Sequence, residues 1–424
     1  MASYRDGFSR RNRPRYDCVS MTSTRPPADR GMSRGYLFRC IALLWLAGVG
    51  LRLTVLAVPP VIPQIHAELN LSETEVGILT GLPQVLFACA AVAGSLLIAR
   101  LGALRTLVIG LILDAVASGL RGAVPAVAPL YAATVVMAFG IAIMQPALPP
   151  LTRQWLPDRV GFATAVYSNG LLIGEILPTA LTIQFLLPLI DESWRLSFVV
   201  WAVPTGLIAL AVAVLAPRSS QPNASSPAAL RWWPDWNRLV WRLGLMLASV
   251  TSMYFGSNAF IPDYLRYIGR PDLIGATLTA LNLGQLPASL LLLTVIGRIE
   301  LRPWPYVLAA VLFLIGILGL ALAPGVWIIA AAGLVGFAAG ATFVLMLALP
   351  PILSPPDDVH RVSAAMLTLG YTGAVIVPIV SGIAWDLTGV GAMVFLPIGA
   401  CTVMLFGLGA TMRFEPRDSG GEIS

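Results

Sequence analysis

Long apolar stretches, separated by short segments rich in polar residues, glycine or proline, make up most of this chain. The stretches repeatedly reach about 20 residues without a charge, the length that an α-helix needs to cross the hydrocarbon core of a bilayer. Prolines, glycines and polar loops separate them. The pattern predicts twelve transmembrane helices, at about 37–60, 76–98, 104–121, 127–150, 161–187, 196–216, 240–262, 273–296, 305–323, 326–350, 362–385 and 390–412.

The composition supports this interpretation and excludes a soluble domain. Hydrophobic residues make up 57% of the 424 residues, charged residues make up only 11%, and the mean hydropathy is +0.81. Average soluble domains contain about 25% charged residues. We therefore predict an all-α, multi-pass membrane protein whose surroundings are a lipid bilayer.

The distribution of basic residues predicts the orientation of the helices. All 27 basic residues are arginines, and only Arg121, Arg195, Arg266 and Arg270 fall in the predicted outer loops if the N-terminus is cytoplasmic. The other arginines outside the span cores then fall on the cytoplasmic side, as the positive-inside rule requires. We expect both termini to be cytoplasmic and the protein to lie in the cell inner membrane. The net charge of +6 follows from this orientation, and no nucleic-acid partner is expected.

Five regions divide the chain. We predict a disordered basic cytoplasmic tail at 1–36, two six-helix halves at 37–216 and 240–412, a flexible linker at 217–239 and a second tail at 413–424. Sequence elements recur between the halves at an offset of 199 to 201 residues, as in Ile62-Pro63 and Ile261-Pro262, Gly170 and Gly370, and Pro178 and Pro378. Because six spans return the chain to its starting side, the halves are predicted to be parallel repeats with a solute site between them.

One charge lies inside the first span. Arg52 is about 20 Å into the predicted helix, where inserting an arginine costs at least about 2.5 kcal/mol. Such a residue is retained for an acidic side chain or for an anionic ligand. Its guanidinium group can bind an oxyanion through two hydrogen bonds and does not lose its proton.

Polar residues at helical spacing mark four further spans. They are Thr164, Ser168, Glu175, Thr179 and Thr182 in span five; Thr251, Tyr254 and Asn258 in span seven; Asn282, Gln285 and Ser289 in span eight; and Thr368, Tyr371 and Thr372 in span eleven. Such stripes either connect helices or face a hydrated cavity, and four of them together with Arg52 favour the cavity. We predict substrate contacts from Arg52, Gln145, Tyr167, Asn258, Asn282, Gln285 and Tyr371.

Two interpretations of Arg52 remain open. In the first, it anchors a small anion in the central cavity; in the second, it is paired permanently with Glu175. A third hypothesis combines them: an arriving anion displaces Glu175, which takes up a proton and couples transport to the proton gradient. Asp114 is expected to make a structural hydrogen bond, and Gly170 with Gly174 to allow close helix approach.

Other chemistry lacks support. The two histidines, His66 and His360, fall in predicted loops on opposite sides of the membrane, so no metal site is expected. The chain contains no phosphate-binding GxxxxGK[ST] loop, and no nucleophile lies with a base or metal cluster. We expect no cofactor, no enzymatic activity and no obligate protein partner.

Several motifs carry a resemblance to a known family. Two parallel six-helix halves, with Gly94 followed by Arg100-Leu101-Gly102 and Arg105 after span two, resemble the major facilitator superfamily, although Ala99 replaces an acidic residue of that loop. A further set of short motifs resembles the cyanate/nitroimidazole transporter family. These motifs are Leu51-Arg52, Val58-Pro59, Leu69-Asn70-Leu71-Ser72, residues 77–83, Tyr167-Ser168, Ile261-Pro262 and residues 286–289. Gly50 and Leu53 flank Arg52 where that family often has Asn and Pro. The resemblance implies secondary transport of small anions or small polar heterocycles.

We therefore predict a secondary active transporter that moves a small anionic solute, cyanate-like or organic, by alternating access, with protons as a possible coupling partner. The alternative within transport is an exporter of small neutral heterocyclic compounds. The alternative from another class is a non-transporting membrane receptor, which would be expected to carry a folded cytoplasmic domain.

Overall fold

The computed structural model describes residues 34–70, 73–123, 126–217 and 233–412. Within these residues all regular secondary structure is helical and no strand occurs, as predicted. Eleven helices in this described part of the chain are long and apolar enough to cross a membrane. The tail at 1–33, most of the linker (218–232) and the tail at 413–424 lie outside the described residues, so the predictions made for them are not addressed.

The first half begins with α1 (Arg34–Gly50), η1 (Pro59–Val61) and α2 (Ile62–Leu69). The long helices α3 (Glu73–Leu101), α4 (Ala103–Ala123) and α5 (Val127–Met144) follow, and α5 continues through η2 (Gln145–Ala147) into α6 (Leu148–Trp155). After η3 (Pro157–Arg159), α7 (Val160–Leu181) passes through a π-helical turn, η4 (Thr182–Leu186), into α8 (Leu187–Leu189). The half ends with α9 (Trp194–Leu215).

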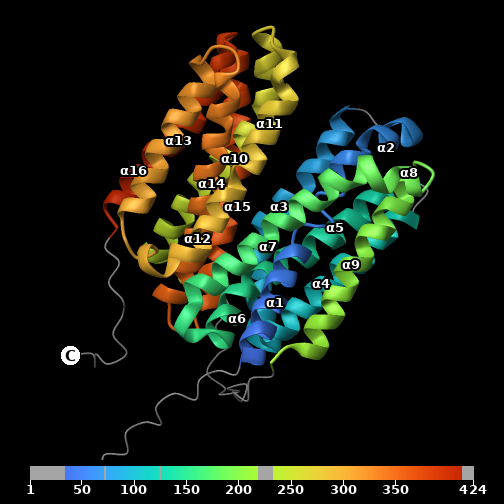
Figure 1. Cartoon of the computed structure of the whole chain (residues 1–424), viewed down its shortest axis with the longest axis vertical. Helices are drawn as coiled ribbons and strands as arrows, with labels where there is room; N and C mark the ends of the chain where they lie inside the picture. Colours follow the sequence, from blue (N-terminus) through green and yellow to red (C-terminus); the bar gives the residue numbers. More distant parts are fainter. Residues whose placement is uncertain (1–33, 71–72, 124–125, 218–232, 413–424) are drawn as a thin grey trace, which may run out of the picture.

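The second half begins with α10 (Arg238–Tyr267) and η5 (Pro271–Leu273). Its eighth span is divided at Gly284 into α11 (Ile274–Leu283) and α12 (Gln285–Ile299). The remaining helices are α13 (Trp304–Leu322), α14 (Trp327–Leu353), α15 (Val359–Thr388), η6 (Gly391–Val394) and α16 (Phe395–Ala410). Figure 1 shows two helical bodies that are separated near α2 and α11 and meet at the other end; between the halves, α3 packs against α15 and α7 packs against α12.

Glycines bring α1 and α7 into close contact. A Cβ atom on Gly48 would lie well inside van der Waals contact with the Tyr167 carbonyl oxygen, and one on Gly170 would meet the carbonyl oxygen of Trp45 in the same way. A Cβ atom on Gly174 would likewise lie well inside van der Waals contact with the carbonyl oxygen of Val49. The prediction that Gly170 and Gly174 allow close helix approach is therefore confirmed, and this contact fixes α7, which carries Glu175, against α1.

The first span is not one continuous helix, which corrects the prediction for residues 37–60. The α-helix ends at Gly50, and residues 51–57 form successive turns before η1. The backbone N–H group of Leu51 is shared between the carbonyls of Ala47 and Gly48, and that of Arg52 bonds to Val49, three residues back, so the last turn tightens as the helix ends. Arg52 lies in this non-helical segment. Irregular backbone at membrane depth is tolerated where protein or a cavity surrounds it.

Two further placements differ from the sequence prediction. Arg121, assigned to an outer loop, belongs to α4 and is fully buried. The predicted loop histidines both lie in helices, His66 in α2 and His360 near the start of α15. Their residues remain far apart in the chain, and among the described residues no group of three or more potential metal ligands occurs.

Candidate functional site

A cavity of about 710 Å³ lies between the two halves. Its wall reaches Pro59 and Gln184, next to α2 and α8, at the end of the molecule opposite the beginning of α1 (Figure 1). Both halves supply its polar lining residues, which are Arg52, Gln84, Arg121, Thr134, Glu175, Thr179, Gln184, Tyr254, Asn258, Thr279 and Asn282. The convergence of polar side chains from both halves makes this cavity the candidate solute site.

Arg52 lies at the inner end of this cavity and is 5% exposed. Its Nε atom is 3.2 Å from Oε1 of Glu175 and makes no aligned hydrogen bond, so the contact is an ion pair. Its Nη2 atom donates a hydrogen bond of 2.7 Å to the hydroxyl of Tyr371. Nη1 donates none to the described residues. The guanidinium group is thus held on two sides and retains one uncommitted nitrogen.

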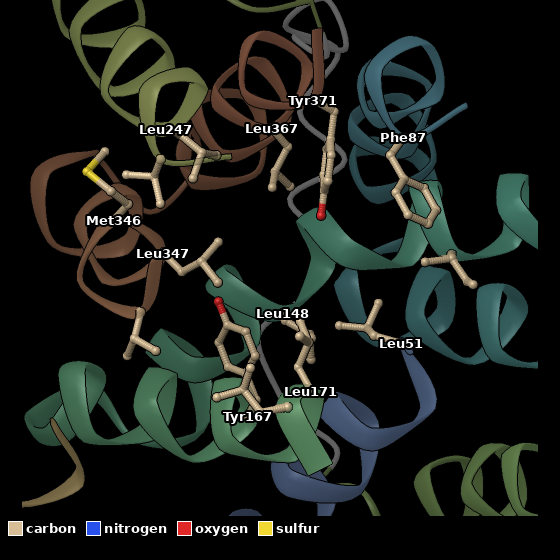
Figure 2. Packing of buried hydrophobic residues seen from close by; sticks show 14 of the residues in the cluster. Leu51, Phe87, Leu148, Tyr167, Leu171, Leu247, Met346, Leu347, Leu367 and Tyr371 are labelled. Atoms are coloured by element: carbon tan, nitrogen blue, oxygen red, sulfur yellow. The ribbon is translucent and has the colours of Figure 1, made fainter. Parts of the chain in front are cut away.

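Aromatic rings surround the same guanidinium group. The Phe87 ring centroid lies 5.2 Å from its central carbon, and that of Tyr371 lies 5.9 Å away. The two rings are themselves in tilted contact, with centroids 5.2 Å apart (Figure 2). Cation–π attraction favours the charged guanidinium here. Sequence reasoning missed Phe87, because an aromatic residue in an apolar span gives no polar signal.

Gln145 supports Tyr371 from the opposite half of the protein. Its side chain is buried in η2, and Nε2 lies 3.1 Å from the Tyr371 hydroxyl oxygen, to which it donates. Tyr371 thereby links α15 of the second half to Arg52 and Gln145 of the first. Gln145 lies outside the set of residues that line the cavity, so any effect on a solute in this conformation passes through Tyr371.

Three polar residues of the second half form a chain of hydrogen bonds on the facing wall. The Tyr254 hydroxyl donates to Oδ1 of Asn282, and Nδ2 of Asn282 donates to Oδ1 of Asn258 at 3.1 Å. A smaller chamber of about 30 Å³ is lined by Arg52, Glu175, Tyr254, Gln285 and Tyr371 among others. That space holds about one water-sized group. The structure therefore brings Arg52, Glu175, Gln285 and Tyr371 around one small space.

Tyr167 lies away from this space. It is 2% exposed, it does not line either chamber, and its hydroxyl has no hydrogen-bond partner. Figure 2 shows its ring packed in the apolar region near Leu148 and Leu171. The predicted contact between Tyr167 and a solute is not formed in this conformation and stays a prediction for another one.

The polar stripe predicted in span five divides between two environments. Glu175 and Thr179 line the cavity, whereas Thr182 accepts a hydrogen bond of 2.9 Å from Nε1 of Trp201 in α9. Thr164 and Ser168 are buried without hydrogen-bond partners. Helical spacing alone does not distinguish residues that line the cavity from residues that are buried in the protein. It places residues on one face of a helix but does not show what packs against each end of that face.

The cavity is closed at the end where α1 begins. Nη1 of Arg153, in α6, donates hydrogen bonds to the carbonyl oxygens of Pro351, at 2.9 Å, and Ser354, at the end of α14. These bonds connect the two halves directly. Helix C-terminal carbonyls lack intrahelical partners, and a guanidinium group satisfies them with charge-assisted bonds.

Replacing Arg153 with alanine is expected to open this end. One charge-assisted hydrogen bond contributes about 1.5 kcal/mol or more, so the ratio of open to closed conformations should rise about tenfold. Spin labels on the exposed positions Gln154 and Asp357 report this ratio as a distance distribution. Arg105→Ala, which removes an exposed arginine of the first half, is the control. Identical distributions in all three proteins would contradict the role assigned to Arg153.

Comparisons with known proteins agree with this architecture. A sequence profile of the Major Facilitator Superfamily matches residues 44–269. The cyanate transport protein CynX of Escherichia coli is 27% identical over 381 residues, covering 89% of this chain and 97% of that protein. The 2-nitroimidazole transporter of Escherichia coli is 25% identical over 386 residues, covering 89% of this chain and 96% of that protein.

A solved structure shows the same fold. The Major Facilitator Superfamily transporter FucP, in its outward conformation, superimposes with a TM-score of 0.71 at 14% sequence identity. The match covers 89% of this chain and 99% of FucP. At this level of identity the likeness concerns the arrangement of the helices and not the solute.

Proposed function

This chain belongs to the Major Facilitator Superfamily of transporters, and on that premise we propose that it moves a small anionic solute across the inner membrane by alternating access. The observation that supports this proposal most strongly is the position of Arg52. Its buried guanidinium group lines the cavity between the halves, and its Nη1 atom donates no hydrogen bond to the described residues. The receptor alternative is set aside, because the family consists of transporters. The predicted absence of enzymatic activity and of an obligate protein partner stays a prediction.

The geometry around Arg52 supports binding of an anion by exchange. Glu175 lies 3.2 Å from the guanidinium group and offsets its charge. An oxyanion bound at the Nη1 end of the guanidinium group would gain charge-assisted hydrogen bonds and compete with Glu175 for the same positive charge. The ion pair and the anion anchor are thus two states of the same residue in this proposal.

The size of the site favours a small solute. The chamber at Arg52 has about 30 Å³ of free space, and it adjoins the cavity of about 710 Å³ through shared residues, among them Arg52, Glu175 and Tyr254. One terminal atom of a cyanate-like ion, or one carboxylate oxygen of a small organic acid, fits the inner chamber, with the remaining atoms in the larger cavity. That CynX is a cyanate transport protein supports this class of solute.

A specific observation also supports the alternative of a neutral heterocycle. Tyr254, Phe255 and Tyr371 place aromatic rings beside the polar groups of the inner chamber, and flat heterocycles stack on such rings. Another relative is a 2-nitroimidazole transporter. For this solute the Arg52–Glu175 pair would stay intact during transport.

Uptake into proteoliposomes distinguishes the two solutes. Purified protein is reconstituted, and radiolabelled cyanate, acetate and 2-nitroimidazole are offered separately, with protein-free liposomes as the control. We expect saturable uptake of cyanate, of acetate or of both. Each of these anions is expected to inhibit the uptake of the other. Saturable transport of 2-nitroimidazole alone would replace the proposed anion by the heterocycle.

Coupling to protons is a separate hypothesis that concerns Glu175. If the displaced carboxylate takes up a proton with each anion, wild-type uptake should rise when the outside is made acidic relative to the inside. Glu175→Gln carries no exchangeable charge, so its uptake should no longer depend on the pH gradient. Asp263→Asn, which changes an exposed carboxylate paired with Arg266, is the matched control. Glu175→Gln with the pH dependence of the wild type would refute proton coupling through this residue.

A further inference from the structure

The segment that carries Arg52 consists of turns with irregular backbone hydrogen bonding: the Arg52 N–H group bonds three residues back, whereas those of Leu53 and Leu56 bond four residues back. Between the end of α1 at Gly50 and the start of η1 at Pro59 there is no regular helix. Residues 51–54 are nevertheless buried. A non-helical segment inside a bundle keeps one conformation only if neighbouring helices satisfy its polar groups.

Thr54, two residues after Arg52, receives that support from α4. Its hydroxyl donates a hydrogen bond of 2.6 Å to Oδ1 of Asp114. Its carbonyl oxygen accepts one of 3.3 Å from Nη1 of Arg121. Asp114 and Arg121 are seven residues apart, which places them on the same face of α4 about two turns apart. One helix therefore holds both the side chain and the backbone of Thr54.

These two charged residues are far from water. Asp114 and Arg121 are both 0% exposed. The Arg121 guanidinium group lies 4.2 Å from the ring centroid of Phe198, and its Nη1 atom also contacts the sulfur of Met137 at 3.0 Å. Burying a charged group costs free energy unless it is paired. The contact that both residues make with Thr54 therefore needs a structural or functional explanation.

A direct role for Arg121 in binding a solute does not fit its environment. Arg121 borders the cavity, but its Nε and Nη2 atoms are covered and have no hydrogen-bond partner. An anion in the cavity of this conformation cannot reach them. What Arg121 contacts directly is the segment that carries Arg52.

We propose that Asp114 and Arg121 form a clamp on Thr54 that fixes the non-helical segment and thereby sets the position of the Arg52 guanidinium group in the cavity. They are positioning residues that act through Thr54. The role in transport rests on the proposed function, but the position of Arg52 is measurable without any solute.

Thiol labelling measures that position as an electrostatic effect. Leu56 lines the cavity four residues after Arg52, so a cysteine there reacts in the field of the guanidinium group. In a background with Cys18, Cys40, Cys89 and Cys401 replaced by alanine, Leu56→Cys is labelled in detergent with an anionic and with a cationic methanethiosulfonate reagent. The ratio of the two rates reports the local positive potential.

Four variants are compared in this background. Thr54→Val removes the hydroxyl at nearly constant shape, Thr54→Ala removes it together with the methyl group, and Thr54→Ser keeps it; none of them changes the number of charges. Ser118→Ala is the matched control, because Ser118 is a buried α4 hydroxyl that bonds to no described residue. We expect the anion-to-cation ratio to fall about threefold or more in Thr54→Val and in Thr54→Ala, since the potential weakens as Arg52 moves away. Thr54→Ser and Ser118→Ala should keep the original ratio.

The outcomes separate this proposal from the proposed function. An unchanged ratio in folded Thr54→Val would overturn the clamp, and so would an equal loss in Ser118→Ala. If Thr54→Val does not fold, an unchanged ratio in Thr54→Ala overturns it instead. If the ratio changes as expected but the wild type takes up none of the offered anions, the clamp stands and the proposed function fails.

Discussion

Arg52→Ala is expected to reduce anion uptake by about a hundredfold or more, because the anion loses charge-assisted hydrogen bonds of about 1.5–3 kcal/mol each and an unpaired carboxylate remains where the anion should bind. In this variant Glu175 would repel the solute from the cavity. Arg52→Lys keeps the charge but loses the planar pair of donors, so we expect intermediate uptake. Initial rates in proteoliposomes over a range of anion concentrations measure both variants.

The double variant Arg52→Ala with Glu175→Gln tests whether Arg52 contacts the solute. It removes both charges of the pair that are 3.2 Å apart, and so avoids an unpaired carboxylate. If Arg52 anchors the anion, the double variant should transport as poorly as Arg52→Ala. Recovery of wild-type uptake would show instead that Arg52 serves only to neutralise Glu175.

Gly170→Ala is expected to prevent normal assembly of the first half. Its new methyl group would overlap the carbonyl oxygen of Trp45, so α7 must move away from α1 or both helices must distort. Overpacking of this kind costs about 1–3 kcal/mol, and here the clash is with backbone rather than a flexible side chain. A fall in the melting temperature, or loss of monodisperse protein after size-exclusion chromatography in detergent, measures the effect.

Gly399→Ala is the matched control for this substitution. Gly399 lies in α16, and a Cβ atom there would have no neighbour within 4 Å. Alanine is favoured over glycine in a helix by about 0.5–1 kcal/mol, so the control should be as stable as the wild type or slightly more stable. Equal melting temperatures for both variants would mean that the α1–α7 contact is looser than described.

Much of the fold could be predicted from the sequence, because a bilayer imposes a simple length rule on apolar helices. The spans, their punctuation by Gly and Pro, and the close approach at Gly170 and Gly174 all follow from local patterns. The pairing of Arg52 with Glu175 was one of two interpretations, and the structure contains that pair. Its role in binding a solute stays a prediction.

Other features depend on tertiary contacts that hydropathy does not encode. The α-helix of span one ends at Gly50 although the apolar run continues, because hydropathy measures transfer to lipid and not backbone conformation. Arg121 was assigned to a loop because a charge at the end of an apolar run normally marks its boundary. The available signal was Asp114, seven residues earlier on the same helical face, which offers a buried arginine a nearby opposite charge.

The most direct test of the central claim is ligand stabilisation of purified wild type and Arg52→Ala, with cyanate, acetate and 2-nitroimidazole side by side. A ligand that binds the folded state stabilises it by about 2.7 kcal/mol at a hundred times its dissociation constant, which raises the melting temperature. If Arg52 anchors the solute, an anion should stabilise the wild type but not Arg52→Ala. Equal stabilisation of both proteins by 2-nitroimidazole, with no effect of either anion, would contradict it.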